Sequence, residues 1–123
     1  MAHDVKHDLE KNLVIIKHSD HVDKDDLWNA RLNALKLVQD HESPRILVDM
    51  RDINMTTTTM ERFEFAQSHN KYFPSRTKIA TVISKNDPKK DDHQFVETVS
   101  LNRGFLLRVF EDEREAEKWL LGI

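Results

Sequence analysis

The chain has 123 residues, of which 33% are charged and 38% hydrophobic, and it carries 19 basic and 22 acidic side chains. This length and composition predict a single globular domain, residues 1–123, with enough chain to bury one core. The net charge of −3 argues against a general nucleic-acid binder, since phosphate contacts need a basic face. The lack of cysteine excludes disulfides, thiolate metal sites and cysteine nucleophiles.

Glycine is scarce, since only Gly104 and Gly122 occur. A phosphate-binding loop, a dinucleotide fingerprint or a nucleophile elbow each needs more glycine than this, so we expect no nucleotide cofactor and no serine hydrolase. No apolar run approaches the length that spans a membrane, and no signal peptide is recognisable, so the expected location is the cytoplasm.

The first half of the chain alternates between strand and helix patterns. A β-rich apolar run predicts a strand at 13–18, and turn residues before it indicate an earlier strand at 5–9 that pairs with it as a hairpin. Apolar residues at three- and four-residue spacing then predict a helix at 23–40. After the break at Pro44, residues 45–50 are apolar without alternation, which is typical of a buried parallel strand.

The second half repeats this alternation. Pro74 ends the first helix of this half, because the residue before a proline is pushed out of helical geometry. The predicted elements are a helix at 59–72, a strand at 77–83, a helix at 88–102, a strand at 105–110 and a helix at 112–121. Strands that alternate with helices predict an α/β fold with a mostly parallel sheet of four to five strands and helices packed on it.

Four consecutive threonines, Thr56–Thr59, stand between a predicted strand and a predicted helix. Thr58 and Glu61 have the spacing of a capping box, in which each side chain bonds the other residue's backbone amide. The functional alternative is phosphorylation of Thr57 or Thr58, because the free amides and the dipole of a helix N-terminus favour a phosphate. Arg62 lies close enough in sequence to pair with such a phosphate. The capping role is the favoured interpretation.

Two charged segments are weaker candidates for a site. Residues 18–21, His-Ser-Asp-His, could contribute to a divalent metal site, but no third histidine has a suitable spacing, so a solvated loop is favoured and we expect no metal. Residues 85–93 follow the C-terminal end of a predicted strand, where open α/β sheets bind ligands, yet such loops are usually solvated turns. No serine, histidine and aspartate set is visible, and we predict no catalytic residue.

Two segments carry a resemblance to a known family. Residues 108–120 read RVFEDEREAEKWL, which resembles the C-terminal signature of the SpoIIAA-like, or STAS-like, bacterial domains. In these domains a last strand passes through an acidic turn into a helix that ends in Trp-Leu, here Trp119 and Leu120. Residues 46–53 read ILVDMRDI and resemble their central strand, which ends in an aspartate. The resemblance implies the same α/β fold over nearly the whole chain, with Trp119 packed against the sheet.

The anti-sigma-factor-antagonist branch of this family implies a function for the threonines. Its central strand leads to an Asp-Ser-Ser/Thr-Gly motif, whose serine is phosphorylated at a helix N-terminus. Thr57 or Thr58 takes the position of that serine, although the aspartate–serine pair and the glycine are replaced by threonines and Met60. The resemblance therefore implies a non-enzymatic regulatory or interaction module with a protein partner. Whether the chain forms a homodimer is left open.

Another branch, with SEC14-like similarity, implies an alternative function as a carrier or sensor of a small apolar or lipid-like ligand. Such a ligand would lie between the sheet and the helices. Core packing is the other interpretation of the same apolar residues, and it is favoured. The residues that would line a ligand site are Met55, Met60, Phe63, Phe65, Tyr72 and Phe73.

Overall fold

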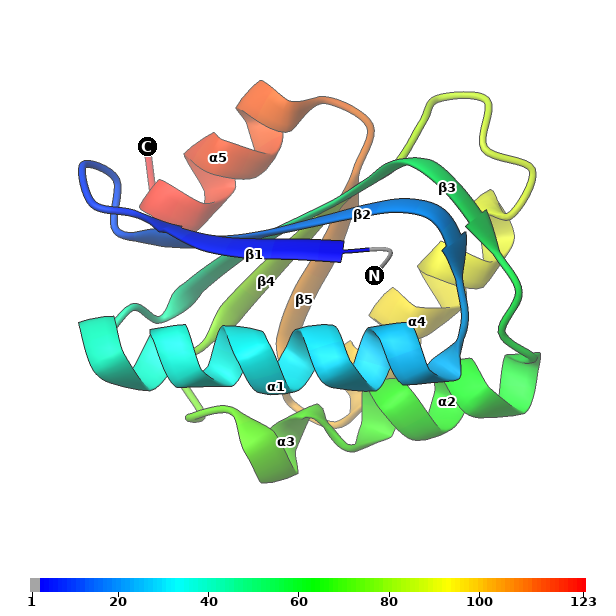
Figure 1. Ribbon diagram of the computed structural model, residues 1–123, viewed down its shortest axis with the longest axis horizontal. Helices are drawn as coiled ribbons and strands as arrows, with labels where there is room; N and C mark the ends of the chain where they lie inside the picture. The colour runs from blue at the N-terminus through cyan, green and yellow to red at the C-terminus, as the bar shows by residue number, and fades with distance from the viewer. Residues whose placement is uncertain (1–2) are drawn as a thin grey trace.

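The computed structural model describes residues 3–123. Five strands form one sheet in the order β1-β2-β3-β4-β5 (Figure 1). β1 pairs with β2 in antiparallel fashion, as the predicted hairpin requires, and β2, β3, β4 and β5 are parallel to one another. The strands are β1 (His3–Asp8), β2 (Leu13–Val22), β3 (Arg45–Met55), β4 (Lys78–Val82) and β5 (Leu106–Phe110). The predicted α/β fold with a mostly parallel sheet is confirmed.

Helices cover both faces of the sheet, with α1, α2, α3 and α4 on one side and α5 on the other (Figure 1). α1 packs on β1 and β2, α4 packs on β5 and α2, and α5 lies on the opposite face against β3, β4 and β5. Across residues 3–123, no helix has the length and apolar character needed to cross a membrane. The helices are α1 (Lys24–His41), α2 (Thr59–Gln67), α3 (His69–Tyr72), α4 (Lys90–Asn102) and α5 (Glu113–Leu121).

The two faces of the sheet carry separate hydrophobic cores. Ile46 and Val48 of β3 point into the larger core beneath α1, α2 and α4, whereas Leu47 points into the smaller core beneath α5. Successive side chains of a strand alternate between faces, so a central strand that is covered on both sides must be apolar at every position. This explains the unbroken apolar run that predicted a buried parallel strand.

Trp119 of α5 packs at the edge of the smaller core, as expected from the C-terminal signature. Its ring lies 5.7 Å from the ring of Phe110 in β5, centroid to centroid. The ammonium of Lys78 in β4 lies 4.7 Å from the indole centroid and donates to the Trp119 carbonyl at 2.9 Å. Trp119 is half-buried rather than fully buried, so it closes the core instead of filling its centre.

Two predicted segments differ in the structure. The helix expected at 59–72 is two helices, because the chain leaves α2 at Ser68, whose hydroxyl donates to the carbonyl of Phe65 at 2.9 Å, before α3 begins. Residues 18–21 were predicted as a solvated loop, and this is wrong. They continue β2 as far as Val22, where the strand pairs with the equally extended end of β3.

Candidate functional site

The start of α2 is held by a complete capping box. The Glu61 amide donates to the Thr58 hydroxyl oxygen at 3.1 Å, and the Thr58 amide donates to the Glu61 carboxylate at 2.9 Å. The preceding Thr56 amide donates to the carbonyl of Val22 at 2.9 Å, which ties the threonines to the end of β2. Thr58 itself is exposed. Its capping role therefore leaves its hydroxyl accessible at a helix N-terminus.

Thr57 has the opposite environment. It is 5% exposed, and its carbonyl and hydroxyl oxygens accept hydrogen bonds from Nη1 of Arg62 at 2.6 and 2.8 Å. Arg62 is 4% exposed, and its Nη2 lies 3.2 Å from the Asp92 carboxylate of α4. The two adjacent threonines thus differ in exposure: Thr57 is buried and bonded to Arg62, whereas Thr58 lies at the surface.

Exposed apolar side chains occur on α2 and on the neighbouring α4. Met60 is 63% exposed and Phe95 of α4 is 37% exposed. Phe63 is half-buried, and its ring centroid lies 6.4 Å from that of Phe95. The expectation that Met60 lines an internal site is therefore wrong, because the first turn of α2 turns this side chain outward. Instead, Thr58, Met60, Phe63 and Phe95 form a mixed surface, which we call the α2 patch.

A cavity of about 60 Å³ lies between the sheet and the helices α1, α2, α3 and α4. Native cores leave few voids larger than a water molecule, so this space is notable for a small domain. Met55, Phe65 and Phe73 contribute to its lining and also belong to the larger core. Phe63 and Tyr72 were expected there as well, but the lining does not include them. We call this space the central cavity.

Four charged or titratable side chains that were not among the residues expected to line a ligand site also line the central cavity: Arg31, Arg62, His69 and His93. Arg31 stands four residues after Leu27, on the apolar face of α1, and is 2% exposed. An arginine at a position of the apolar stripe of a predicted helix was the sequence signal that could have identified Arg31. Burial lowers the pKa of Arg31 to about 10, with Tyr72 acting in the opposite direction, so the side chain remains a cation at neutral pH.

The charged segment 85–93 contributes one residue to the cavity. His93 is 4% exposed, and its Nε2 lies 3.3 Å from the Asp87 carboxylate, at ion-pair distance but without hydrogen-bond geometry. Burial lowers the pKa of His93, although Asp87 opposes this. His18 is also buried and lines the cavity, whereas His21 is exposed. In the described part of the chain, no three histidine, aspartate or glutamate side chains lie close enough together to hold a metal ion.

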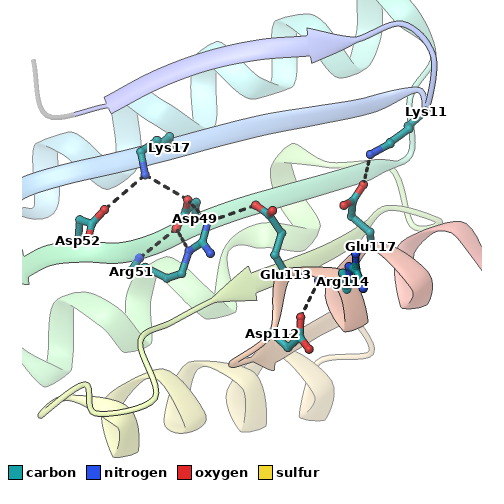
Figure 2. A network of polar contacts seen from close by, with 9 residues as sticks. All are labelled: Lys11, Lys17, Asp49, Arg51, Asp52, Asp112, Glu113, Arg114 and Glu117. Atoms are coloured by element: carbon teal, nitrogen blue, oxygen red, sulfur yellow. Dashed lines mark hydrogen bonds and ion pairs between the residues drawn. The ribbon is translucent and has the colours of Figure 1, made fainter.

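A network of charges occupies the opposite face of the sheet (Figure 2). Asp49 of β3 accepts hydrogen bonds from Lys17 of β2 at 3.1 Å and from the guanidinium of Arg51 at 2.9 and 3.0 Å. Burial would raise the pKa of Asp49, but the bonds from Arg51 and Lys17 outweigh it and lower the pKa to about 2. Arg51 also pairs with Glu113 of α5 at 3.2 Å. These charges satisfy one another and hold α5 to the sheet, so the network is structural.

Comparison with known proteins places this geometry in a family. A family model described as SpoIIAA-like matches residues 13–121. No protein with a curated description matches the chain.

Solved structures of other proteins share the fold. They include an uncharacterised protein with a SpoIIAA-like fold from Shewanella loihica PV-4, at 14% identity and a TM-score of 0.60, with 97% of this chain and 92% of that chain covered. The anti-sigma factor antagonist SpoIIAA in its unphosphorylated form is 13% identical, with a TM-score of 0.63 and 99% and 98% covered. An anti-sigma factor antagonist from Mycobacterium paratuberculosis is 13% identical, with a TM-score of 0.61 and 96% and 92% covered. Because the family model spans most of the chain, this protein belongs to the SpoIIAA-like family.

Proposed function

We propose that this protein is a non-enzymatic regulatory module that binds a partner protein through the α2 patch. The observation that carries the proposal is the exposed Thr58 hydroxyl at the N-terminus of α2, a helix that also exposes Met60 and packs on α4, where Phe95 is exposed. Apolar side chains surrounded by polar ones are typical of protein-binding surfaces. Two of the structural neighbours are anti-sigma factor antagonists, which supports a regulatory role for this fold.

Phosphorylation of Thr58 would control this binding. A phosphate adds about −1.5 to −2 charges at pH 7, and the helix dipole and free amides at the start of α2 favour that charge. Thr57 is the poorer acceptor, because its hydroxyl is buried and already bonded to Arg62. A new charge in the middle of an apolar contact would oppose partner binding, since it would have to be desolvated.

The test compares Thr58→Ser, Thr58→Asp and the control Ser75→Asp in pull-downs from host lysate. Ser75 is exposed in the loop before β4, whereas α2 follows β3, so the control adds the same charge at the opposite end of these two parallel strands. We expect Thr58→Ser and Ser75→Asp to recover the partner and Thr58→Asp to lose it. Met60→Ser should also weaken recovery. Equal recovery by all four variants would reject the α2 patch as the binding surface.

A second candidate function is the binding of a small ligand in the central cavity. The observation that favours it is the cavity itself, about 60 Å³ between the sheet and four helices and lined mainly by apolar side chains. The volume suits a ligand of a few heavy atoms rather than a whole lipid, because an engineered cavity of about 150 Å³ accommodates benzene. Native mass spectrometry of protein purified from its own host tests this function through any retained mass, and the same spectra would reveal a phosphate.

A further inference from the structure

Arg31 is a buried cation whose charge is not balanced by an acidic side chain. Within residues 3–123 no carboxylate lies at ion-pair distance from it. Its Nη1 donates to the Phe65 carbonyl at 3.0 Å and to the Ser68 hydroxyl at 2.9 Å, and it lies 3.3 Å from Nδ1 of His69. Its Nε and Nη2 have no hydrogen-bond partner in the same part of the chain. Arg31 thus retains donors that a ligand can use.

Aromatic rings hold this guanidinium in place. Its central carbon lies 4.1 Å from the ring centroid of Tyr72, 4.4 Å from that of Phe65 and 5.2 Å from that of Trp28. Cation–π attraction offsets part of the cost of burying the charge but does not saturate the N–H donors in the plane of the group. Arg62, the other arginine of the cavity, differs because Asp92 pairs with it.

Arg31 determines where the proton of the neighbouring His69 lies. The guanidinium of Arg31 can only donate, so Nδ1 of His69 must accept and the proton must sit on Nε2. That Nε2 is buried and has no hydrogen-bond partner among the described residues. Burial, assisted by the charge of Arg31, lowers the pKa of His69 to about 3, so the ring is neutral at pH 7. The pair therefore carries a single positive charge.

We infer that the central cavity is an anion site, in which the free Nε and Nη2 donors of Arg31 bind the carboxylate of a small organic acid; the Nε2–H of His69 faces away from Arg31 and lies outside this bidentate contact. The inference rests on the second function proposed above and adds the chemical class of the ligand. A carboxylate only accepts hydrogen bonds, its plane matches that of a guanidinium, and its single charge balances one cation. A phosphate monoester would bring a second negative charge for which the pair has no counterpart.

The apolar lining and the volume of the cavity determine which organic group can be attached to the carboxylate. Ile16, Ile46, Val48 and Leu107 line the cavity from the sheet and are buried. Such walls favour a short alkyl or aryl group over a hydroxylated one, because a buried hydroxyl needs a partner. A volume of about 60 Å³ is smaller than the cavity of about 150 Å³ that accommodates the six heavy atoms of benzene. An acid with six heavy atoms, such as butyrate, therefore needs Met50 or Met55 to move, and methionine is the side chain that adapts most easily.

The test uses butyrate, 1-butanol and n-butylamine, which share a four-carbon skeleton and carry a negative, a neutral and a positive head group. Binding is followed by two-dimensional ¹H–¹⁵N NMR of the tryptophan indoles. Trp28 lies against Arg31 and Phe65, whereas Trp119 lies on the opposite face of the sheet and serves as an internal control. We expect butyrate to shift the Trp28 signal and leave the Trp119 signal in place. Butyrate should bind at least about tenfold more tightly than 1-butanol, and butylamine should not bind.

Arg31→Met removes the charge and keeps a long apolar side chain, and Arg51→Met is the matched control on the other face. We expect Arg31→Met to lose about 10- to 100-fold in affinity for butyrate and to keep its affinity for 1-butanol, while Arg51→Met binds like the parent. If 1-butanol binds the parent as tightly as butyrate, the anion site is wrong but the ligand-binding function stands. If neither molecule shifts Trp28, both are wrong. Unchanged butyrate binding by Arg31→Met also overturns the anion site. Should Arg31→Met fail to fold, the comparison of butyrate with 1-butanol in the parent protein decides the question.

Discussion

Lowering the pH from 7 to 4.5 should weaken the fold through His69. Its side chain is 2% exposed, and burial and the Arg31 charge lower its pKa to about 3. In the unfolded chain an imidazole has a pKa of about 6.5. Between these two values the unfolded chain binds one more proton, so the free energy of unfolding falls as the pH drops below about 6.5 and continues to fall until about 3. From pH 7 to 4.5 this linkage amounts to about 2.5 kcal/mol.

Urea unfolding at the two pH values measures this loss, in the parent and in His69→Asn. The asparagine oxygen lies near the position of Nδ1, where it can accept from Arg31, and it does not titrate. The pKa of His93 is also lowered by burial, but His93 is present in both chains and cancels in the comparison. We expect the parent to lose about 2.5 kcal/mol more than the variant. Equal losses would refute the assignment of His69 as a neutral, buried ring.

Three further predictions concern stability. Thr58→Ala should lower the free energy of unfolding by about 0.5–2 kcal/mol and Thr58→Ser should not, because serine can make the same cap; equal urea midpoints for both would contradict the capping box. Trp119→Ala should lower the free energy of unfolding by roughly 2–3 kcal/mol, less than the loss of a fully buried tryptophan, and an unchanged melting temperature would show that the indole makes no stabilising contact. Asp49→Asn should cost about 1–2 kcal/mol at pH 7, discounted because the partner side chains of Lys17 and Arg51 are 49% and 41% exposed. The folded pKa of Asp49 is depressed, so its contribution is present above about pH 4 and is lost as the pH falls through about 2; an Asp49→Asn cost that is the same at pH 2 as at pH 7 would contradict this.

The strand–helix order was predictable because it depends on local patterns. Apolar runs, turn residues and helical spacing lie within a few residues of one another, and each acts on its own segment. The capping box was predictable for the same reason, since Thr58 and Glu61 are three residues apart and need only a helix start to meet. The strand at 18–22 was missed because its polar residues resemble a loop. Only hydrogen bonding to the extended end of β3 keeps that segment in the sheet.

The sequence by itself determined the fold class, the helix start and the family resemblance, because each of these is encoded in contiguous residues. The tertiary structure decided which threonine is exposed, since the buried Thr57 is bonded to Arg62, five residues later, and Arg62 in turn pairs with Asp92 on another helix. It also brought Arg31 of α1 to His69 of α3, 38 positions away, around one cavity. No local pattern encodes such a meeting, because the distance between two side chains on different helices is set by how both helices pack on the sheet.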